Sequence, residues 1–266
     1  MTTTTEGVRS LPLAGAGHSI TRARAGIDPP TDRKESATHQ IVASCGDLAD
    51  SILMSIKPAF AADPATARYY DQRAREYDDW YTGRGVFAER DRPGWTAEVG
   101  QIVNLVSQLP PARTLDVACG TGFLTRHLPG FVVGVDQSPT MVAIAQSRLV
   151  DGVAVVGDAL HLPVADDAFD RVFTGHFYGH LPAGERAAFV AEARRVAGEL
   201  VVVDTARRED APAERWEPRV LSDGSHHQVY KRYLSADQLA DELGGTPLLA
   251  GRWFVAARVS WAPRTG

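Results

Sequence analysis

The sequence predicts an α/β protein with a Rossmann-like, doubly wound and mostly parallel sheet that has helices on both faces. Two observations support this fold class. Short apolar runs that suit buried strands alternate with stretches of helical periodicity. Unusual polar residues follow these runs, and the carboxyl ends of parallel strands are where such sheets bind ligands. Successive parallel strands need right-handed crossovers, so we expect the helices to cover both faces of the sheet.

The elements can be placed in order along the chain. An aromatic helix is expected at about 66–81, and a second helix over 96–109 that ends at Pro110-Pro111. Ser138 can cap a helix that starts at Pro139, and 183–197 has the spacing of another helix. The tail 245–261 supplies further strand material. The strand candidates are 114–119, 131–136, 154–156, 169–173 and 199–204.

The chain is predicted to be a single domain over 65–266 behind a poorly ordered N-terminal extension, 1–64. The extension contains four consecutive threonines and few aromatic residues, which is typical of a mobile segment. One short helix around Ile52 is expected within it. No apolar run approaches the length of a membrane span and the N-terminus lacks a secretory apolar region, so we expect a cytoplasmic protein without an integral membrane segment.

Composition narrows the function classes. The 266 residues include 28 Lys plus Arg against 33 Asp plus Glu, a net charge of −5, whereas nucleic-acid readers usually carry a basic face. We therefore expect no nucleic-acid partner. The two cysteines, Cys45 and Cys119, lie in different contexts, which argues against a disulfide framework. No His, Cys or Asp cluster has metal-ligand spacing, so no metal is predicted. The oligomeric state stays open.

The first strand runs into a glycine turn, Asp116-Val-Ala-Cys-Gly-Thr-Gly122, which is expected to lead into a helix. Gly120 and Gly122 allow a sharp turn and a close approach of a ligand to the backbone. The alternatives are an ordinary strand-to-helix turn and a dinucleotide-binding loop. The dinucleotide fingerprint needs a small residue where this chain has Thr125, so a nicotinamide cofactor fits poorly.

Two further carboxylates follow strands. Asp136 ends the second strand and can accept hydrogen bonds from both hydroxyls of a ribose; its alternative role, helix capping, is already served by Ser138. Asp158 follows the third strand and can accept from an adenine amino group. A plain turn residue is the alternative for Asp158.

Together these residues resemble the class I S-adenosyl-methionine-dependent methyltransferases, and in particular the small-molecule branch that includes the ubiquinone and menaquinone methyltransferases. The resemblance runs from Tyr69 to about Val259. It implies that S-adenosyl-L-methionine is the cofactor and that Asp136 holds its ribose. Ala118 stands where many members have their first glycine, which is a mild departure. The residues implied in cofactor binding are Tyr70, Tyr77, Asp116, Ala118, Gly120, Gly122, Asp136, Gln137, Asp158, Ala159 and Thr174.

The helix at about 66–81 resembles the lid helix of that branch. Such a helix closes over the cofactor and excludes water, and the faces of Tyr70 and Tyr77 would stabilise a sulfonium cation. Equally, each tyrosine can be an ordinary core aromatic. Methyl transfer from a sulfonium is an in-line displacement that depends mainly on alignment of the acceptor. An enzyme of this kind therefore does not require a catalytic side chain.

His176 follows the fourth strand and is the candidate catalytic base, because imidazole titrates near neutral pH. The alternative is a wall residue, and His180 is expected to pack. The stretch at about 206–234 is a polar, aromatic insertion that either selects the substrate or is a solvated loop. We expect an enzyme that methylates a small-molecule acceptor such as a quinone, phenol or secondary metabolite. The alternatives are an NAD(P)-dependent oxidoreductase and a non-catalytic nucleotide-binding protein on the same fold.

Overall fold

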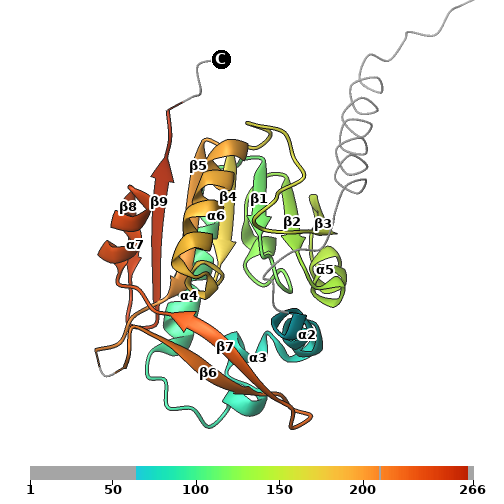
Figure 1. Ribbon diagram of the computed structural model, residues 1–266, viewed down its shortest axis with the longest axis vertical. Coiled ribbons are helices and arrows are strands. Elements are labelled where there is room, and N and C mark those ends of the chain that lie inside the picture. Colours follow the sequence, from blue (N-terminus) through green and yellow to red (C-terminus); the bar gives the residue numbers. More distant parts are fainter. Residues whose placement is uncertain (1–63, 210, 263–266) are drawn as a thin grey trace, which may run out of the picture. The chain divides into compact units, whose positions relative to one another are not determined.

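The computed structural model describes residues 64–209 and 211–262, all of which lie in one compact unit (Figure 1). The extension predicted for the N-terminus, with its short helix around Ile52, lies outside the described residues. The central sheet has seven strands in the order β3-β2-β1-β4-β5-β9-β8. Their bounds are β1 Thr114–Val117, β2 Val132–Asp136, β3 Gly152–Val156, β4 Arg171–Gly175, β5 Glu199–Thr205, β8 Thr246–Ala250 and β9 Phe254–Ser260.

Strands β1 to β5 all run in the same direction, and β9 alone runs opposite to them, because β8, which is antiparallel to β9, points the same way as β5. The chain reverses its crossover direction between β1 and β4, so the carboxyl ends of these two strands form the topological switch point. The predicted fold class is therefore confirmed. The tail that the sequence left unplaced supplies β8 and the reversed strand β9, with helix α7 (Ala236–Leu243) leading into them.

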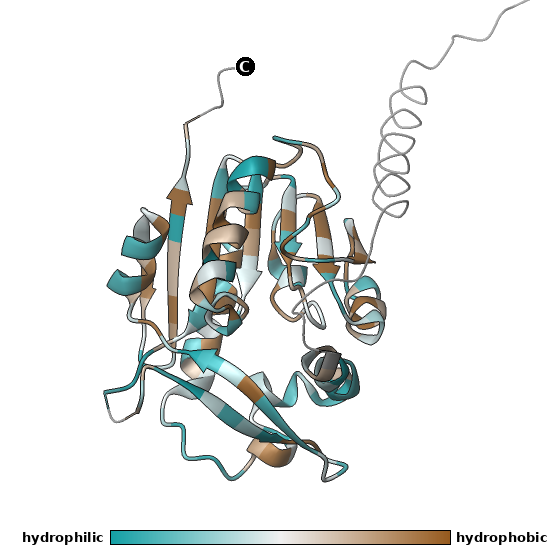
Figure 2. Cartoon of the chain, viewed as in Figure 1, coloured by the Kyte–Doolittle hydropathy of each residue, from teal (hydrophilic) through white to brown (hydrophobic). Residues whose placement is uncertain are grey.

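Two apolar clusters cover the two faces of the sheet, because side chains alternate between its faces along each strand. Leu200 and Val202 of β5 pack in one cluster with helix α6 (Ala183–Val196) and α7. Val201 and Val203 pack on the other side with helix α4 (Trp95–Ser107). In Figure 2, brown lies on the strands of the central sheet and on parts of the helices that flank it. This core fixes where the strand ends lie and so positions the polar residues that follow them.

The helix predicted over 66–81 is broken into three short segments. Helix α2 spans Pro64–Arg73, a 3₁₀ turn η1 spans Ala74–Glu76, and α3 spans Asp79–Thr82 before Gly83 ends it in the left-handed region. Asp78 lies at the break, where its carboxylate accepts from the Thr121 hydroxyl at 2.5 Å and pairs with Arg148 at 2.7 Å. These contacts with the glycine turn compensate for the break in the helix.

The other predicted helices are confirmed with small shifts of their ends. Helix α5 spans Pro139–Gln146, and the Ser138 hydroxyl accepts the Met141 N–H as the predicted cap. The helix expected directly after the glycine turn was wrong. Only a 3₁₀ turn, η3 at Thr125–His127, follows it, since Pro129 and Gly130 redirect the chain into β2 within a few residues. Two further 3₁₀ turns are η2 (Gly85–Phe87) and η4 (Tyr178–His180).

The insertion at about 206–234 forms a two-stranded antiparallel hairpin of β6 (Glu214–Val220) and β7 (His226–Arg232). Figure 1 shows it with α2 and α3 beyond the same end of the sheet, where β4 points, and Figure 2 shows that it is largely hydrophilic. Helix α2 packs on both β7 and α5. Helices α2 and α3 and the hairpin therefore cover the carboxyl ends of the parallel strands. We call these three segments the roof.

Candidate functional site

A cavity of about 690 Å³ opens at the carboxyl ends of β1, β2 and β4. Its volume lies within the usual range of ligand pockets, about 300–1,000 Å³. Helix α2 and the hairpin contribute to its wall along with the strand ends. The residues predicted for the site that line it are Tyr70, Tyr77, Ala118, Gly120, Asp136, Gln137, Ala159 and His176.

The glycine turn contains three residues in the left-handed region, of which Ala118 and Gly120 line the cavity. Ala118, Gly120 and Gly122 have φ values of 59°, 54° and 74°. A Cβ on Gly122 would lie 3.1 Å from the Ala145 Cα, so this glycine lets the turn pack on α5 and does not itself line the cavity. Ala118 takes the same backbone region with a Cβ, at an energetic cost that suggests a local constraint. The turn therefore presents backbone, with little side chain, to the cavity.

Asp136 couples the ends of β1 and β2. Its Oδ2 accepts the Gly120 N–H and its Oδ1 accepts the Ser138 N–H, each at 2.9 Å. Burial raises the pKa of Asp136 to about 6, although these backbone hydrogen bonds oppose the shift. Each carboxylate oxygen has a second lone pair that can accept from a ligand hydroxyl. The sequence-based alternatives for Asp136 are thus both compatible with the fold, because it anchors the loop before α5 and faces the cavity.

Gln137 adds an unsatisfied acceptor to the same wall. Its Oε1 is buried and has no hydrogen-bond partner among the described residues. Because a buried polar atom without a partner is costly, such atoms are candidates for contact with a ligand or with water. Asp136 and Gln137 together offer a compact set of acceptors beside the open backbone of Gly120.

Asp116 and Thr174 lie below the cavity floor. Thr174 is fully buried and its hydroxyl donates to the Val117 carbonyl at 2.7 Å, which fastens β4 to β1. Asp116 is buried beside a void of about 10 Å³, where its Oδ2 accepts from the Thr125 hydroxyl at 2.6 Å and its Oδ1 has no partner among the described residues. Burial raises the pKa of Asp116 to about 8. Their cofactor contacts stay predictions.

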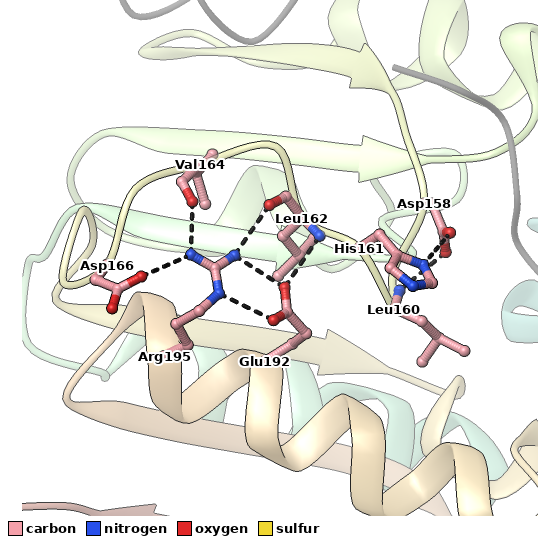
Figure 3. A network of polar contacts seen from close by, with 8 residues as sticks. All are labelled: Asp158, Leu160, His161, Leu162, Val164, Asp166, Glu192 and Arg195. Carbon is pink, nitrogen blue, oxygen red and sulfur yellow. Dashed lines mark hydrogen bonds and ion pairs between the residues drawn. The ribbon is translucent and has the colours of Figure 1, made fainter. Parts of the chain in front are cut away.

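Asp158 turns its carboxylate into its own loop (Figure 3). Oδ1 accepts the Leu160 N–H at 2.9 Å and Oδ2 lies 2.8 Å from Nδ1 of His161, as a turn residue would. Glu192 and Arg195 of α6 hold the rest of this loop in place, through the Leu162 backbone N–H and through backbone carbonyls. The neighbouring Gly157 and Ala159 do line the cavity. The adenine contact of Asp158 stays a prediction that requires its side chain to turn outward.

His176 follows β4 with φ of 60°, and its ring is buried against Trp80, Tyr81 and Phe254. Neither ring nitrogen has a hydrogen-bond partner among the described residues. Burial lowers the pKa of His176 to about 3, so the imidazole is neutral at physiological pH. A neutral ring can accept a hydrogen bond or a proton. A bulky residue in the left-handed region marks local strain, which clusters at functional sites.

His180 packs, as predicted, and ties the roof to the sheet. Its Nδ1 lies 2.6 Å from the Tyr230 carbonyl of β7, and its Nε2 lies 3.3 Å from the Tyr70 hydroxyl of α2.

Burial raises the pKa of Tyr77 to about 12, so its phenol is neutral. Tyr70 and Tyr77 both line the cavity, and their contact with a sulfonium cation stays a prediction.

The sequence did not predict the residues whose contacts join the roof to the rest of the domain, or the residues that line a second cavity. Asp71 of α2 accepts from the Ser138 hydroxyl at 2.6 Å and the Thr140 N–H at 3.2 Å, which attaches the roof to α5. It also missed Arg73, Arg90 and Arg92, which line a second, smaller cavity next to the first. Periodicity carries no signal for such contacts because they join segments far apart in the chain. The segment 68–92 contains six arginines, but it also contains six acidic residues, so its sequence alone does not indicate a basic pocket.

Within the described residues, no cluster of three or more His, Cys, Asp or Glu side chains could hold a metal ion. The described helices also include none with the length and apolarity to cross a membrane.

Comparisons with known proteins find methyltransferases. Residues 115–199 match a family model described as a methyltransferase domain. The demethylmenaquinone methyltransferase of Thermotoga maritima is 36% identical over 112 residues, which cover 39% of this chain and 48% of that protein. The ajmaline N-methyltransferase of Rauvolfia serpentina is 30% identical over 183 residues, covering 57% and 61%. The chain thus spans about half to two thirds of the length of these curated relatives.

Among solved structures, the DhpI–SAH complex matches 75% of this chain and 97% of that chain, with a TM-score of 0.59 and 24% sequence identity. This likeness confirms the fold. The resemblance to methyltransferases is confirmed over the matched segment, which begins at Leu115 in β1 and contains the glycine turn, Asp136 and His176.

Proposed function

We propose that this chain is a class I methyltransferase that transfers a methyl group from S-adenosyl-L-methionine to a small-molecule acceptor. One observation carries the proposal: the acceptors of Asp136 and Gln137 and the open backbone of Gly120 share one wall of a ligand-sized cavity at the topological switch point. Such a wall suits an adenosyl group, which has two ribose hydroxyls and an adenine edge to satisfy. The methyltransferase family match over the same strands supports it.

The residues present fit the donor. The lone pairs of Asp136 that the backbone leaves open would accept from the ribose hydroxyls. Gln137 Oε1 gains a partner if it accepts from the adenosyl group, and the Ala159 amide and Asp158 are proposed for adenine. Tyr70 and Tyr77 would place ring faces near a positively charged sulfur. When bound, S-adenosyl-L-methionine supplies a methyl group already activated by its sulfonium, ready for an in-line displacement.

The chain's own part in the reaction is to align the acceptor and exclude water, which can lower a barrier by about 7–11 kcal/mol. The roof covers the strand ends. His176 is proposed to contact the acceptor through a neutral ring nitrogen. With a pKa of about 3 the imidazole is a weak base, so it would take a proton only from an acidic hydroxyl or from one that loses its proton in the transition state. For other acceptors it would orient the nucleophile by accepting a hydrogen bond.

The dinucleotide alternative is less well supported. A pyrophosphate needs the N-terminus of a helix after the glycine turn. Here the turn leads only into η3, and the Thr125 hydroxyl is bonded to Asp116. By their names, one relative methylates demethylmenaquinone and another methylates ajmaline. These names suggest aromatic compounds and secondary metabolites as acceptor classes.

The activity can be tested with S-adenosyl-methionine that carries a labelled methyl group. The full chain is incubated with a panel of a phenol, a quinol, a secondary amine and phosphorylated alcohols, and transfer of the labelled methyl group to each acceptor is measured. We expect acceptor-dependent turnover that Asp136→Asn abolishes. If the donor binds but no acceptor gives turnover above the protein-free control, the result contradicts the proposed activity and favours a non-catalytic nucleotide-binding protein.

A further inference from the structure

A second cavity, of about 210 Å³, adjoins the first and is strongly basic. We call it the arginine pocket. Glu217 is the one carboxylate among its described lining residues. The chain as a whole is acidic, with 28 basic against 33 acidic residues, so this concentration of positive charge is local. The cations that line the pocket are Arg73, Arg90, Arg92, Arg208, Arg215, Arg219 and Lys231.

Three guanidinium groups converge on the ring of Phe87. The guanidinium carbons of Arg73, Arg90 and Arg92 lie 5.6, 4.7 and 5.9 Å from its centroid. None of the three forms an ion pair with a carboxylate among the described residues. Arg73 is buried and donates to the Tyr69 hydroxyl at 2.7 Å. A ring face offsets only part of the free energy that it costs to remove a cation from water, so this side of the pocket lacks a counter-charge.

The hairpin side does not supply that counter-charge. Arg215 and Arg219 both pair with Glu217, at 2.7 and 2.5 Å, and Lys231 pairs with the buried Asp204 at 2.6 Å. The two carboxylates are thus used by three cations of the hairpin. Burial, and secondly the charge of Arg219, lower the pKa of Arg90. The guanidiniums therefore repel one another across the pocket, and an anion between them would relieve the repulsion.

The arginine pocket and the large cavity share a wall formed by Tyr70, Tyr77, His176 and His180. The hydrogen bond between Tyr70 and His180 lies in this wall. A small molecule anchored in the arginine pocket would therefore extend past the free nitrogens of His176 toward the cavity assigned to the donor. The pocket is thus well placed to hold one end of the acceptor.

We propose that the arginine pocket binds a tetrahedral dianion, a phosphate-type group, on the methyl acceptor and directs the acceptor's nucleophile toward His176. The donors come from α2, the segment 88–94 and the hairpin, so they surround an anion from several directions. This arrangement suits a group with three terminal oxygens better than a planar carboxylate, which one guanidinium fork satisfies. A neutral aromatic acceptor would leave Arg73, Arg90 and Arg92 without a counter-charge. The inference rests on the proposed function, whose acceptor class it narrows.

Titration calorimetry of the full chain at constant ionic strength tests this inference, with inorganic phosphate, glycerol 3-phosphate and acetate as probes. We expect both phosphate probes to bind at least tenfold tighter than acetate, and the ester at least as tightly as the free ion. The double variant Arg90→Gln/Arg92→Gln should weaken phosphate binding at least tenfold. Arg73→Gln should do the same, but Arg73 is buried, whereas Arg90 is exposed and Arg92 half-buried, so the double variant is safer for folding. Arg113→Gln, which breaks an exposed pair with Asp170, is the matched control and should bind like wild type.

Each titration is repeated with S-adenosyl-homocysteine as a separate probe, so that the two proposals fail differently. If S-adenosyl-homocysteine binds but phosphate binds no tighter than acetate, or if the double variant binds phosphate like wild type, the arginine pocket is not an acceptor site and the methyltransferase proposal stands. If only the free ion binds and the ester does not, the acceptor assignment is overturned. If the phosphates bind but S-adenosyl-homocysteine does not, the proposed function itself fails.

Discussion

The Gly120 backbone N–H donates to the Asp136 carboxylate at 2.9 Å, across the ends of β1 and β2. This bond joins the glycine turn to the proposed ribose site, so the two features that the sequence singles out separately act as one unit. Since the Ser138 N–H holds the other oxygen, the carboxylate is fixed in orientation before any ligand arrives. A fixed acceptor loses less conformational entropy on binding than a mobile one.

Asp136→Ala is expected to weaken S-adenosyl-homocysteine binding by about 10²-fold or more. Two charge-assisted hydrogen bonds to ribose would be lost, each contributing about 1.5–3 kcal/mol. Calorimetry measures the affinity, and a thermal unfolding scan checks that the variant is folded, because the carboxylate also anchors two backbone amides. The control is Asp151→Ala, an exposed residue just before β3. Undiminished affinity in folded Asp136→Ala would remove the ribose assignment.

Donor binding should depend on pH through Asp136. The folded protein's carboxyl has a pKa of about 6, so it is ionised above that pH and protonated below it. Affinity for S-adenosyl-homocysteine is therefore expected to be constant from pH 7 to 8 and to fall by up to about tenfold per pH unit below 6. Asp136→Asn should bind weakly with no step in this range. A flat wild-type profile between pH 5 and 8 would contradict the assignment.

His176→Asn separates a base from a wall residue. Asparagine tolerates the left-handed backbone that His176 adopts and keeps a polar group, but it cannot take a proton. With a phenolic acceptor, turnover should fall by about 10²–10⁴ while affinity for S-adenosyl-homocysteine stays near wild type, and the residual rate should rise with pH. His127→Asn, in η3, serves as the control. Wild-type turnover with an unchanged pH profile would leave alignment as the whole catalytic contribution.

Asp116 should make the domain less stable as pH rises. Its pKa is about 8 in the folded protein and about 4 when unfolded. Between these values the folded state holds a proton that the unfolded state has released, so the free energy of unfolding decreases with pH in this window. Asp116→Asn keeps an acceptor for the Thr125 hydroxyl and removes the titration. Urea unfolding at several pH values from 5 to 8 gives the free energy of unfolding as a function of pH. The decrease of this free energy with pH should be smaller in Asp116→Asn than in wild type, by about 1 kcal/mol per pH unit. Equal slopes would contradict the buried, protonated state of Asp116.

The sequence predicts the sheet and its ligand edge because apolar strands and the polar residues after them are local signals. Asp136 and Gly120 were placed correctly on the cavity wall for this reason. Local signals failed at two places. The break near Asp78 depends on Thr121 and Arg148, far along the chain, and the short η3 depends on where the chain must turn into β2.

The arginine pocket could not be predicted because its cations come from α2, the segment 88–94 and the hairpin. Whether a guanidinium has a carboxylate partner depends on the folded packing alone. The same holds for Asp158, whose spacing suits adenine while its carboxylate faces His161 in the folded loop. Spacing places a residue at a strand end, and side-chain direction then depends on its neighbours.

The central claim is tested most directly by titrating the full chain with S-adenosyl-homocysteine and, in parallel, with NADH at pH 7.5. The methyltransferase account predicts one saturable site for S-adenosyl-homocysteine and no binding of NADH at the same concentrations. Saturable binding of NADH without binding of S-adenosyl-homocysteine would contradict it and favour the oxidoreductase alternative.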